Sequence, residues 1–303
     1  MKFIRRHKKL VIILSVLLAL LITAIILVFT VFSLKEVELE FKTETLNITQ
    51  EEQGEIQAEI LKTGGSVFFV GKEKIINDIE KNHPYIKIVN IETQIPNKFI
   101  IHCAEREELY AIESEGKIYF LDEDMKILRI QEEPYSRSEG MPIILSFKNI
   151  KYDELDPTSV VSYTLDLNLG ACEEGQFLNL KSSSDAGTYI AGKFETISKS
   201  ILTAFEENNR GIADVRSMYE SFEIFFEEEV IGGNSYWHIC LKLMLDSTNY
   251  QITLFDADIS LAEKIQVMFV AYSEAQETPE KLIGTKMIIY KQGNEYKYIF
   301  EDA

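Results

Sequence analysis

The 303-residue sequence is poor in the residues that build metal centres and covalent frameworks, with three cysteines and four histidines. Cys103, Cys172 and Cys240 are an odd set at wide spacing, which fits neither a disulfide framework nor a zinc site. The histidines, at positions 7, 83, 102 and 238, also lack ligand spacing. We expect Cys103 to be a buried thiol, because it shares a strand face with Phe99 and Ile101. The sequence leaves open whether Cys172 and Cys240 pair.

Catalytic motifs are lacking too, although two short patterns imitate them. Residues 187–193 have the glycine and lysine spacing of a phosphate-binding loop, but Phe194 follows where Ser or Thr is needed. Ser114 and Lys117 imitate the serine–lysine pair of penicillin-binding enzymes, but they flank an expected hairpin turn and the companion motifs are missing. We interpret both patterns as chance.

Acidic pairs do not build a cation site either. Residues 122–124 read Asp-Glu-Asp, and Asp256 and Asp258 are one residue apart. Both groups lack the rest of a calcium loop, so a solvated turn and a helix cap are the simpler interpretations. The sequence therefore predicts a protein without catalytic residues, cofactor or metal.

Positive charge is scarce after residue 9. Five of the 31 basic residues lie in that amino-terminal tail, which leaves 26 basic and 49 acidic residues beyond it, a net charge of −23. Nucleic-acid binding depends on cationic contacts to phosphate, so this composition excludes nucleic acid as a partner.

Only one long hydrophobic run is present. Residues 10–32 carry no charge and would form a helix of about 34 Å, enough to cross a hydrocarbon core of about 30 Å. The basic tail before the run predicts a cytoplasmic amino terminus and an extracytoplasmic carboxyl terminus. A cleaved signal sequence is the alternative, but the run is too long and lacks a small-x-small cleavage site. We therefore expect a single-pass signal-anchor at 10–33, after a cytoplasmic tail at 1–9.

Small residues recur at every fourth position of the anchor, at Ser15, Ala19 and Thr23. Such spacing lets a second membrane helix approach closely. Chance recurrence in an apolar helix is the simpler explanation, so a helix–helix contact here is only a hypothesis.

The outer part divides into two segments by its periodicity. For residues 35–106 we expect the order β-α-α-β-β, because β-branched runs alternate with helical patterns that Gly64, Gly65 and Pro84 end. The expected elements are strand 37–41, a helix from 49 or 50, a helix from 72, and strands 86–93 and 98–105.

Residues 107–303 predict a larger mixed antiparallel β-domain with flanking helices. Short strands alternate with turn residues, and Ser260 with Glu263 form a capping-box pattern at the start of the last helix. Residues 148–195 match no clear pattern, and we interpret them as an insertion or a long loop with strand fragments. The expected strands are near 108–130, 142–147, 220–226, 236–245, 250–255, 286–290 and 296–300, and the expected helices are 194–208 and 258–273.

This order resembles the FtsQ/DivIB family of bacterial cell-division proteins, in which a signal-anchor precedes a POTRA domain and a β-domain. Residues 84–86 (Pro-Tyr-Ile), 95–98 (Ile-Pro-Asn-Lys) and 105–107 (Glu-Arg-Glu) stand in the family's order and spacing. Residues 258–264 resemble the family's last helix. Glu108 departs from the family, which has proline there, and residues 148–195 have no counterpart.

The resemblance implies a non-catalytic scaffold of the division septum. Its implied partners are FtsL-like and FtsB/DivIC-like proteins, and through them the septal peptidoglycan synthase. A terminal strand with an open edge could accept a partner strand. Tyr296, Tyr298 and Phe300 lie on one face of that strand, where they would either anchor the partner or close the domain's own core.

The alternative is a membrane-anchored extracytoplasmic enzyme or ligand-binding protein of the cell envelope. Its pocket would lie in residues 140–260, and the unreadable segment is its only support. Titratable groups converging in a deep pocket would favour it.

Overall fold

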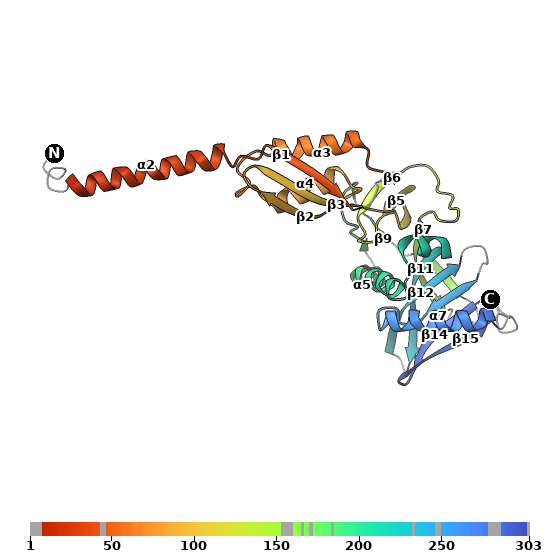
Figure 1. Cartoon of the computed structure of the whole chain (residues 1–303). Helices are drawn as coiled ribbons and strands as arrows, with labels where there is room; N and C mark the ends of the chain where they lie inside the picture. The colour runs from red at the N-terminus through yellow and green to blue at the C-terminus, as the bar shows by residue number, and fades with distance from the viewer. Residues whose placement is uncertain are drawn as a thin grey trace. The chain divides into compact units, whose positions relative to one another are not determined.

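The computed structural model describes residues 8–42, 47–152, 160–164, 167–169, 172–182, 185–231, 234–245, 250–277 and 286–301. The chain divides into two compact units, Met1–Arg106 and Glu107–Ala303. An amino-terminal helix leads into a small α+β domain in the first unit, and the second unit is a larger β-sheet domain with helices (Figure 1). The expected α+β fold class is confirmed.

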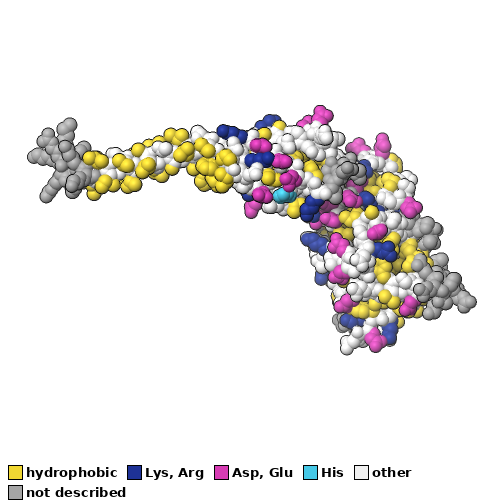
Figure 2. All heavy atoms as spheres, in the orientation of Figure 1, with side chains coloured by type: hydrophobic (Ala, Val, Ile, Leu, Met, Phe, Trp, Pro, Cys, Tyr) yellow, Lys and Arg dark blue, Asp and Glu magenta, His cyan; other side chains and the backbone are white. Residues whose placement is uncertain are grey.

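Helix α2 (Lys8–Thr30) is the apolar run expected to cross a membrane. Residues Leu10–Thr30 are long and apolar enough to span a bilayer, and none of this stretch is buried in the protein. Hydrophobic side chains cover the visible length of the helix (Figure 2). Its length matches the thickness of a hydrocarbon core of about 30 Å.

The small domain in the first unit is a three-stranded sheet backed by two helices. The strand order is β1-β3-β2, with β1 parallel and β2 antiparallel to the central β3. Thr49 caps α3 by accepting a hydrogen bond from the Glu52 amide, and α4 ends one residue before Pro84, at the C-cap His83. The bounds are β1 Glu36–Phe41, α3 Gln50–Lys62, α4 Lys72–Asn82, β2 Ile86–Gln94 and β3 Lys98–Glu105.

Isoleucine is the commonest residue in the core of this domain, with nine of its fourteen described buried residues. Ile56 and Ile60 of α3 and Ile79 of α4 pack on the strand residues Phe99 and Ile101, and all five side chains are nearly inaccessible. Cys103 lies in the same core, as expected, and burial raises the pKa of its thiol to about 12. Short elements with one apolar face each therefore close a single hydrophobic core.

The second unit is built on one large mixed sheet. Its strand order is β15-β14-β13-β12-β11-β7-β4-β5-β6, with β8 on the far end of β7. Three pairs are parallel, namely β11 with β7, β4 with β7, and β13 with β14. The first strands are β4 Tyr110–Ser114, β5 Lys117–Leu121, β6 Ile127–Gln131, β7 Ile143–Tyr152 and β8 Val160–Thr164. The later strands are β11 Tyr219–Ile231, β12 Asn234–Leu245, β13 Gln251–Leu254, β14 Lys286–Gln292 and β15 Glu295–Glu301, and Leu167–Asn168 (β9) pairs separately with Lys181–Ser182 (β10).

Two long helices, α5 (Asp185–Glu207) and α7 (Leu261–Glu277), share the sheet's main hydrophobic core. Phe194, Ile197 and Phe205 of α5 and Ile265 and Met268 of α7 are buried in it. Both helices therefore cover the same face of the sheet. A short helix, α6 (Ile212–Met218), leads into β11.

Several expected elements differ from those observed. The helix expected from residue 194 begins at Asp185, so the segment interpreted as an insertion contributes the end of β7, β8, β9, β10 and the first turns of α5. The last helix begins at Leu261 rather than at 258. Ser260 has φ 49°, whereas a capping serine has extended backbone, so the expected capping box is wrong.

Candidate partner-binding edge

The β14–β15 hairpin forms one edge of the large sheet. Strand β15 pairs with β14 from Gln292↔Glu295 to Lys286↔Glu301, and no other described strand pairs with it. Gly293 has φ 65°, as a type II′ turn requires at its first central residue. The two-residue turn fixes the register, and the outer side of β15 presents backbone groups that can pair with an added strand.

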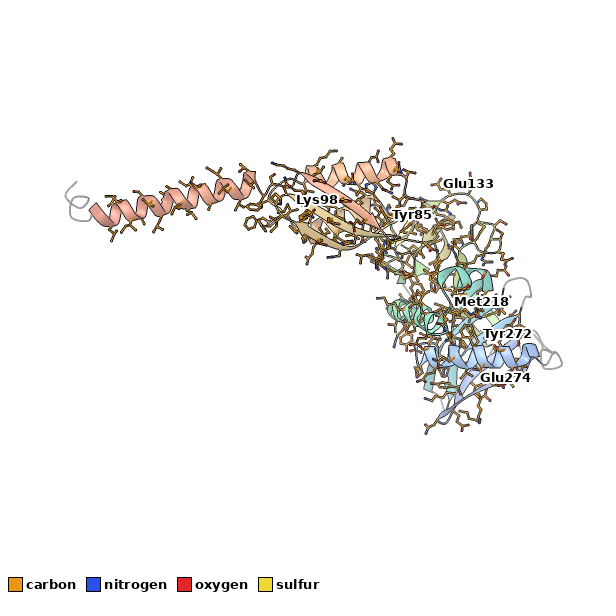
Figure 3. All side chains as sticks on the ribbon, viewed as in Figure 1. Tyr85, Lys98, Glu133, Met218, Tyr272 and Glu274 are labelled. Atoms are coloured by element: carbon orange, nitrogen blue, oxygen red, sulfur yellow. The ribbon has the colours of Figure 1, made fainter. Side chains whose placement is uncertain are left out.

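The aromatic side chains of β15 lie toward helix α7. The Tyr296 hydroxyl donates to the Glu263 carboxylate at 2.5 Å, and the Tyr298 hydroxyl donates to the Glu274 carboxylate at 3.2 Å. The Phe300 ring packs against the main core and contacts the Tyr298 ring, with ring centroids 5.6 Å apart. Figure 3 labels Glu274 on the helix. The three aromatic residues thus support the edge strand from one side, although Tyr298 stays 40% exposed.

The opposite face of β15 is open and mixed in polarity. Ile299 is 43% exposed, and Lys297 donates to Glu295 at 2.7 Å. This hydrogen bond raises the pKa of Lys297 and lowers that of Glu295. In β-strand addition the backbone groups of the open edge give affinity, and side chains such as Ile299 and Lys297 would set specificity.

Two of the three small residues of the anchor carry a hydroxyl, and each hydroxyl forms a hydrogen bond within helix α2. The Ser15 hydroxyl donates to the Val11 carbonyl and the Thr23 hydroxyl to the Ala19 carbonyl, both at 2.9 Å. A second helix is therefore not needed to satisfy these groups. Close packing through Ser15, Ala19 and Thr23 stays a hypothesis that rests on their size.

The second unit contains a cavity of about 580 Å³ between α5 and the segment before it. Its described lining is mostly apolar, with Asn179, Asp124 and Lys199 as polar residues and without a serine, threonine, cysteine or histidine. Asp124 and Lys199 are the titratable residues of that described lining. The three cysteines are free thiols, and the described residues contain no group of three or more potential metal ligands.

The acidic residues before α7 contact a histidine and a lysine of the protein itself. Asp256 lies 2.7 Å from the His238 ring, and Asp258 lies 3.5 Å from the Lys193 ammonium. The Lys264 ammonium is buried and donates to the carbonyls of Asp256 and Ile259. The sequence suggested a helix cap or a cation site for Asp256 and Asp258, and neither interpretation includes these contacts. No sequence spacing links these residues, because strands and helices far apart in the chain bring them together.

Comparison with known proteins places the first unit in a family. Residues 40–106 match the model of the FtsQ-type POTRA domain. The chain is similar to proteins named Cell division protein DivIB from Clostridium tetani (33% identity over 24% of this chain and 27% of the relative) and Clostridium botulinum strain Hall (28% over 43% and 48%). It also resembles the DivIB of Staphylococcus aureus (30% over 31% and 21%). The matches therefore span between about a fifth and about half of the length of these relatives.

Proposed function

Because the chain belongs to the FtsQ/DivIB family of bacterial cell-division proteins, we propose that it is a bitopic membrane scaffold of the division machinery. The observation that carries this proposal is the combination of a spanning helix with an FtsQ-type POTRA domain directly after it. We further propose that it binds FtsL-like and FtsB/DivIC-like proteins at the septum and so helps to control the septal peptidoglycan synthase. It acts through contacts and performs no chemistry.

Depletion of the protein tests the division role. We expect depleted cells to keep growing while septation fails, so that cell length or the number of incomplete septa rises as the protein disappears. Re-expression of the full chain should restore division. Normal septation in cells that lack detectable protein would contradict the proposal.

The open edge of β15 is the proposed docking element for the partner pair. In a two-residue hairpin the residues that flank the turn exchange both backbone hydrogen bonds, and bonded pairs alternate from there. Counting from Gln292↔Glu295, the amides of Tyr296, Tyr298 and Phe300 face away from β14. A partner strand would bind these outward groups, and the side chains would set its register.

Two substitutions at one position separate backbone from side chain. Tyr298→Pro removes an outward amide that β14 does not use, which an edge strand tolerates, whereas Tyr298→Ala removes the ring and keeps the amide. We expect Tyr298→Pro to weaken binding of the purified FtsL–DivIC-type pair about fivefold more than Tyr298→Ala, because one backbone hydrogen bond contributes about 1 kcal/mol.

Binding is measured by titration of the full chain in nanodiscs, with circular dichroism as the control for folding. Equal affinities of the two variants would exclude strand addition at this edge. The division role would stand, because depletion tests it separately.

A further inference from the structure

The part of the first unit that adjoins helix α2 ends in exposed aromatic residues. A turn at residues 66–70, called the aromatic turn from here on, carries Phe68 and Phe69, whose side chains are 51% and 72% exposed. The neighbouring Ser66 and Val67 are buried. The turn is therefore fixed at its base in the domain while its two rings point outward.

The aromatic turn is bonded to the chain directly after helix α2. The Val67 amide donates to the Phe32 carbonyl at 2.8 Å, and the Leu34 amide donates to the Gly65 carbonyl at 2.9 Å. Ser33 and Ser66 form an antiparallel bridge. These bonds hold the turn within four residues of Thr30, where the helix ends.

The rings of the turn contact the rings of the anchor. The centroid of Phe69 lies 6.4 Å from that of Phe29, with the planes nearly stacked, and the centroid of Phe68 lies 5.1 Å from that of Phe32. Phe29 belongs to the last turn of the span, and each helical residue advances about 1.5 Å. The Phe69 ring is therefore at the depth of the span's last turn.

A second loop gathers apolar surface at the same end of the domain. The carbonyl of Asn97, in the β2–β3 turn, accepts hydrogen bonds from the amides of Lys35 and Glu36, and Ile95 in that turn is 64% exposed. Among the described residues of 33–106, the exposed large hydrophobic side chains are Phe68, Phe69, Val89 and Ile95. Three of the four thus lie where the domain meets the anchor, and in Figure 2 the hydrophobic surface of the helix continues onto this end.

We propose that the aromatic turn is a second membrane contact, inserted at the boundary between acyl chains and headgroups of the leaflet in which helix α2 ends. Lipid is the occupant that the structure favours, because the turn is continuous with a helix that lipid must cover. Aromatic rings are favoured at that boundary. A cavity of about 340 Å³ lies beside the turn, and its lining combines Phe29, Phe69 and Val70 with the polar side chains of Lys74 and Asp78. The contact would hold the domain against the bilayer surface independently of any division partner.

The depth of residue 69 tests the proposal directly. The full chain with its one tryptophan replaced (Trp237→Phe) receives Phe69→Trp and is reconstituted in vesicles of phosphatidylcholine and phosphatidylglycerol. The acyl chains are brominated either near the headgroup or near the chain end. We expect the tryptophan to lose most of its emission to bromines near the headgroup and little to bromines near the chain end.

Tryptophan at two other positions provides the controls for insertion of the anchor and for contact of the rest of the domain with lipid. Leu20→Trp, in the middle of the span, should be quenched most by bromines near the chain end, which confirms that the anchor is inserted. Val89→Trp, six residues before Ile95 along β2 and so about 20 Å from that turn, should keep its emission. Emission of Phe69→Trp that bromine leaves unchanged, while Leu20→Trp is quenched, would overturn the proposal. Equal quenching at 69 and 89 would also overturn it, because the flank of the sheet would then lie on lipid.

Discussion

A buried ion pair between Glu80 and Arg106 shows what single residues contribute to the first unit. The Arg106 guanidinium lies 2.8 Å from the Glu80 carboxylate and also donates to the Ile86 carbonyl. The other Glu80 oxygen accepts the Ile88 amide at 2.8 Å. Both charged side chains are almost fully buried, and they join α4, β2 and the end of β3. The Glu-Arg-Glu run at 105–107 therefore has a structural role at Arg106.

Removing one partner of this pair should be costly. Glu80→Ala leaves the Arg106 charge buried, and we expect a loss of about 3–5 kcal/mol in the free energy of unfolding of this unit. Hydrogen exchange of the β2 and β3 amides in the full chain measures it. Glu36→Ala, which removes an exposed partner of Lys98, should cost no more than about 1 kcal/mol. Equal effects of the two substitutions would show that the buried pair contributes no more than an exposed one.

At the scale of elements, helix α7 depends on a lysine at its first turn. Lys264 is 1% exposed, and its ammonium donates to the carbonyls of Asp256 and Ile259 at 2.7 and 2.8 Å. Asp256 and Ser260 both have left-handed backbone, so this loop does not present an ordinary helix cap. The lysine side chain holds the loop in a left-handed backbone conformation that few residues other than glycine adopt.

Lys264→Met should destabilise the second unit by about 1–3 kcal/mol, because the carbonyls of Asp256 and Ile259 lose the donor that the buried lysine supplies. Burial lowers the pKa of Lys264, so the folded state carries its charge at a cost below the lowered pKa. That cost disappears as pH rises toward the ordinary pKa of 10.5, where the unfolded chain also loses the proton. The stability difference between wild type and variant should therefore widen with rising pH.

Denaturation of the detergent-solubilised chain, followed by Trp237 emission, measures this difference. Lys117→Met, at an exposed lysine of β5 whose ion pair with Glu132 is also exposed, is the matched control and should cost no more than about 1 kcal/mol. A difference between wild type and Lys264→Met that narrows as the pH rises would contradict the assigned direction of the pKa shift.

Cap and turn residues in the sequence predicted most helices and strands. The predictions were wrong where contacts between residues far apart in the sequence determine the structure. Thr49, the two glycines after α3 and Pro84 mark the ends of α3 and α4 in the sequence itself. The first turns of α5 contain Gly187 and Gly192, which disfavour a helix. The described α5 residues in the main core begin at Phe194, so packing supports the helix after these glycines. The β15 edge was predictable from alternation, but the bonds of Tyr296 and Tyr298 to α7 required the three-dimensional structure.

At the scale of the whole molecule, the order of strands could not be read from the sequence. Strand β7 lies between β4 and β11, in parallel to both, whereas the strand patterns predicted a mixed antiparallel domain and no order of strands. Parallel neighbouring strands are joined by long connections, so turn residues next to a strand do not indicate which strand it pairs with. The division into an anchor helix, a small α+β domain and a larger sheet domain needs only composition and periodicity.

The proposed topology has a direct test. With Cys172→Ser as background, Glu133→Cys on the exposed loop after β6 should react with a membrane-impermeant maleimide in intact cells that lack an outer membrane (Figure 3). Lys2→Cys should react only after permeabilisation, because the basic tail favours the cytoplasm. The reverse pattern of labelling would invert the orientation and would place the carboxyl terminus in the cytosol.

The parallel pairing of β1 with β3 has a mechanical consequence. The chain enters β1 from the membrane and leaves toward the second unit from the far end of β3, across six paired residues from Glu36↔Lys98 to Phe41↔Cys103. Tension between the anchor and the second unit therefore pulls these two strands past each other lengthwise. Their cross-strand bonds would carry the force together and would not open one after another like a zipper. The small domain would therefore resist such tension through all six residue pairs at once.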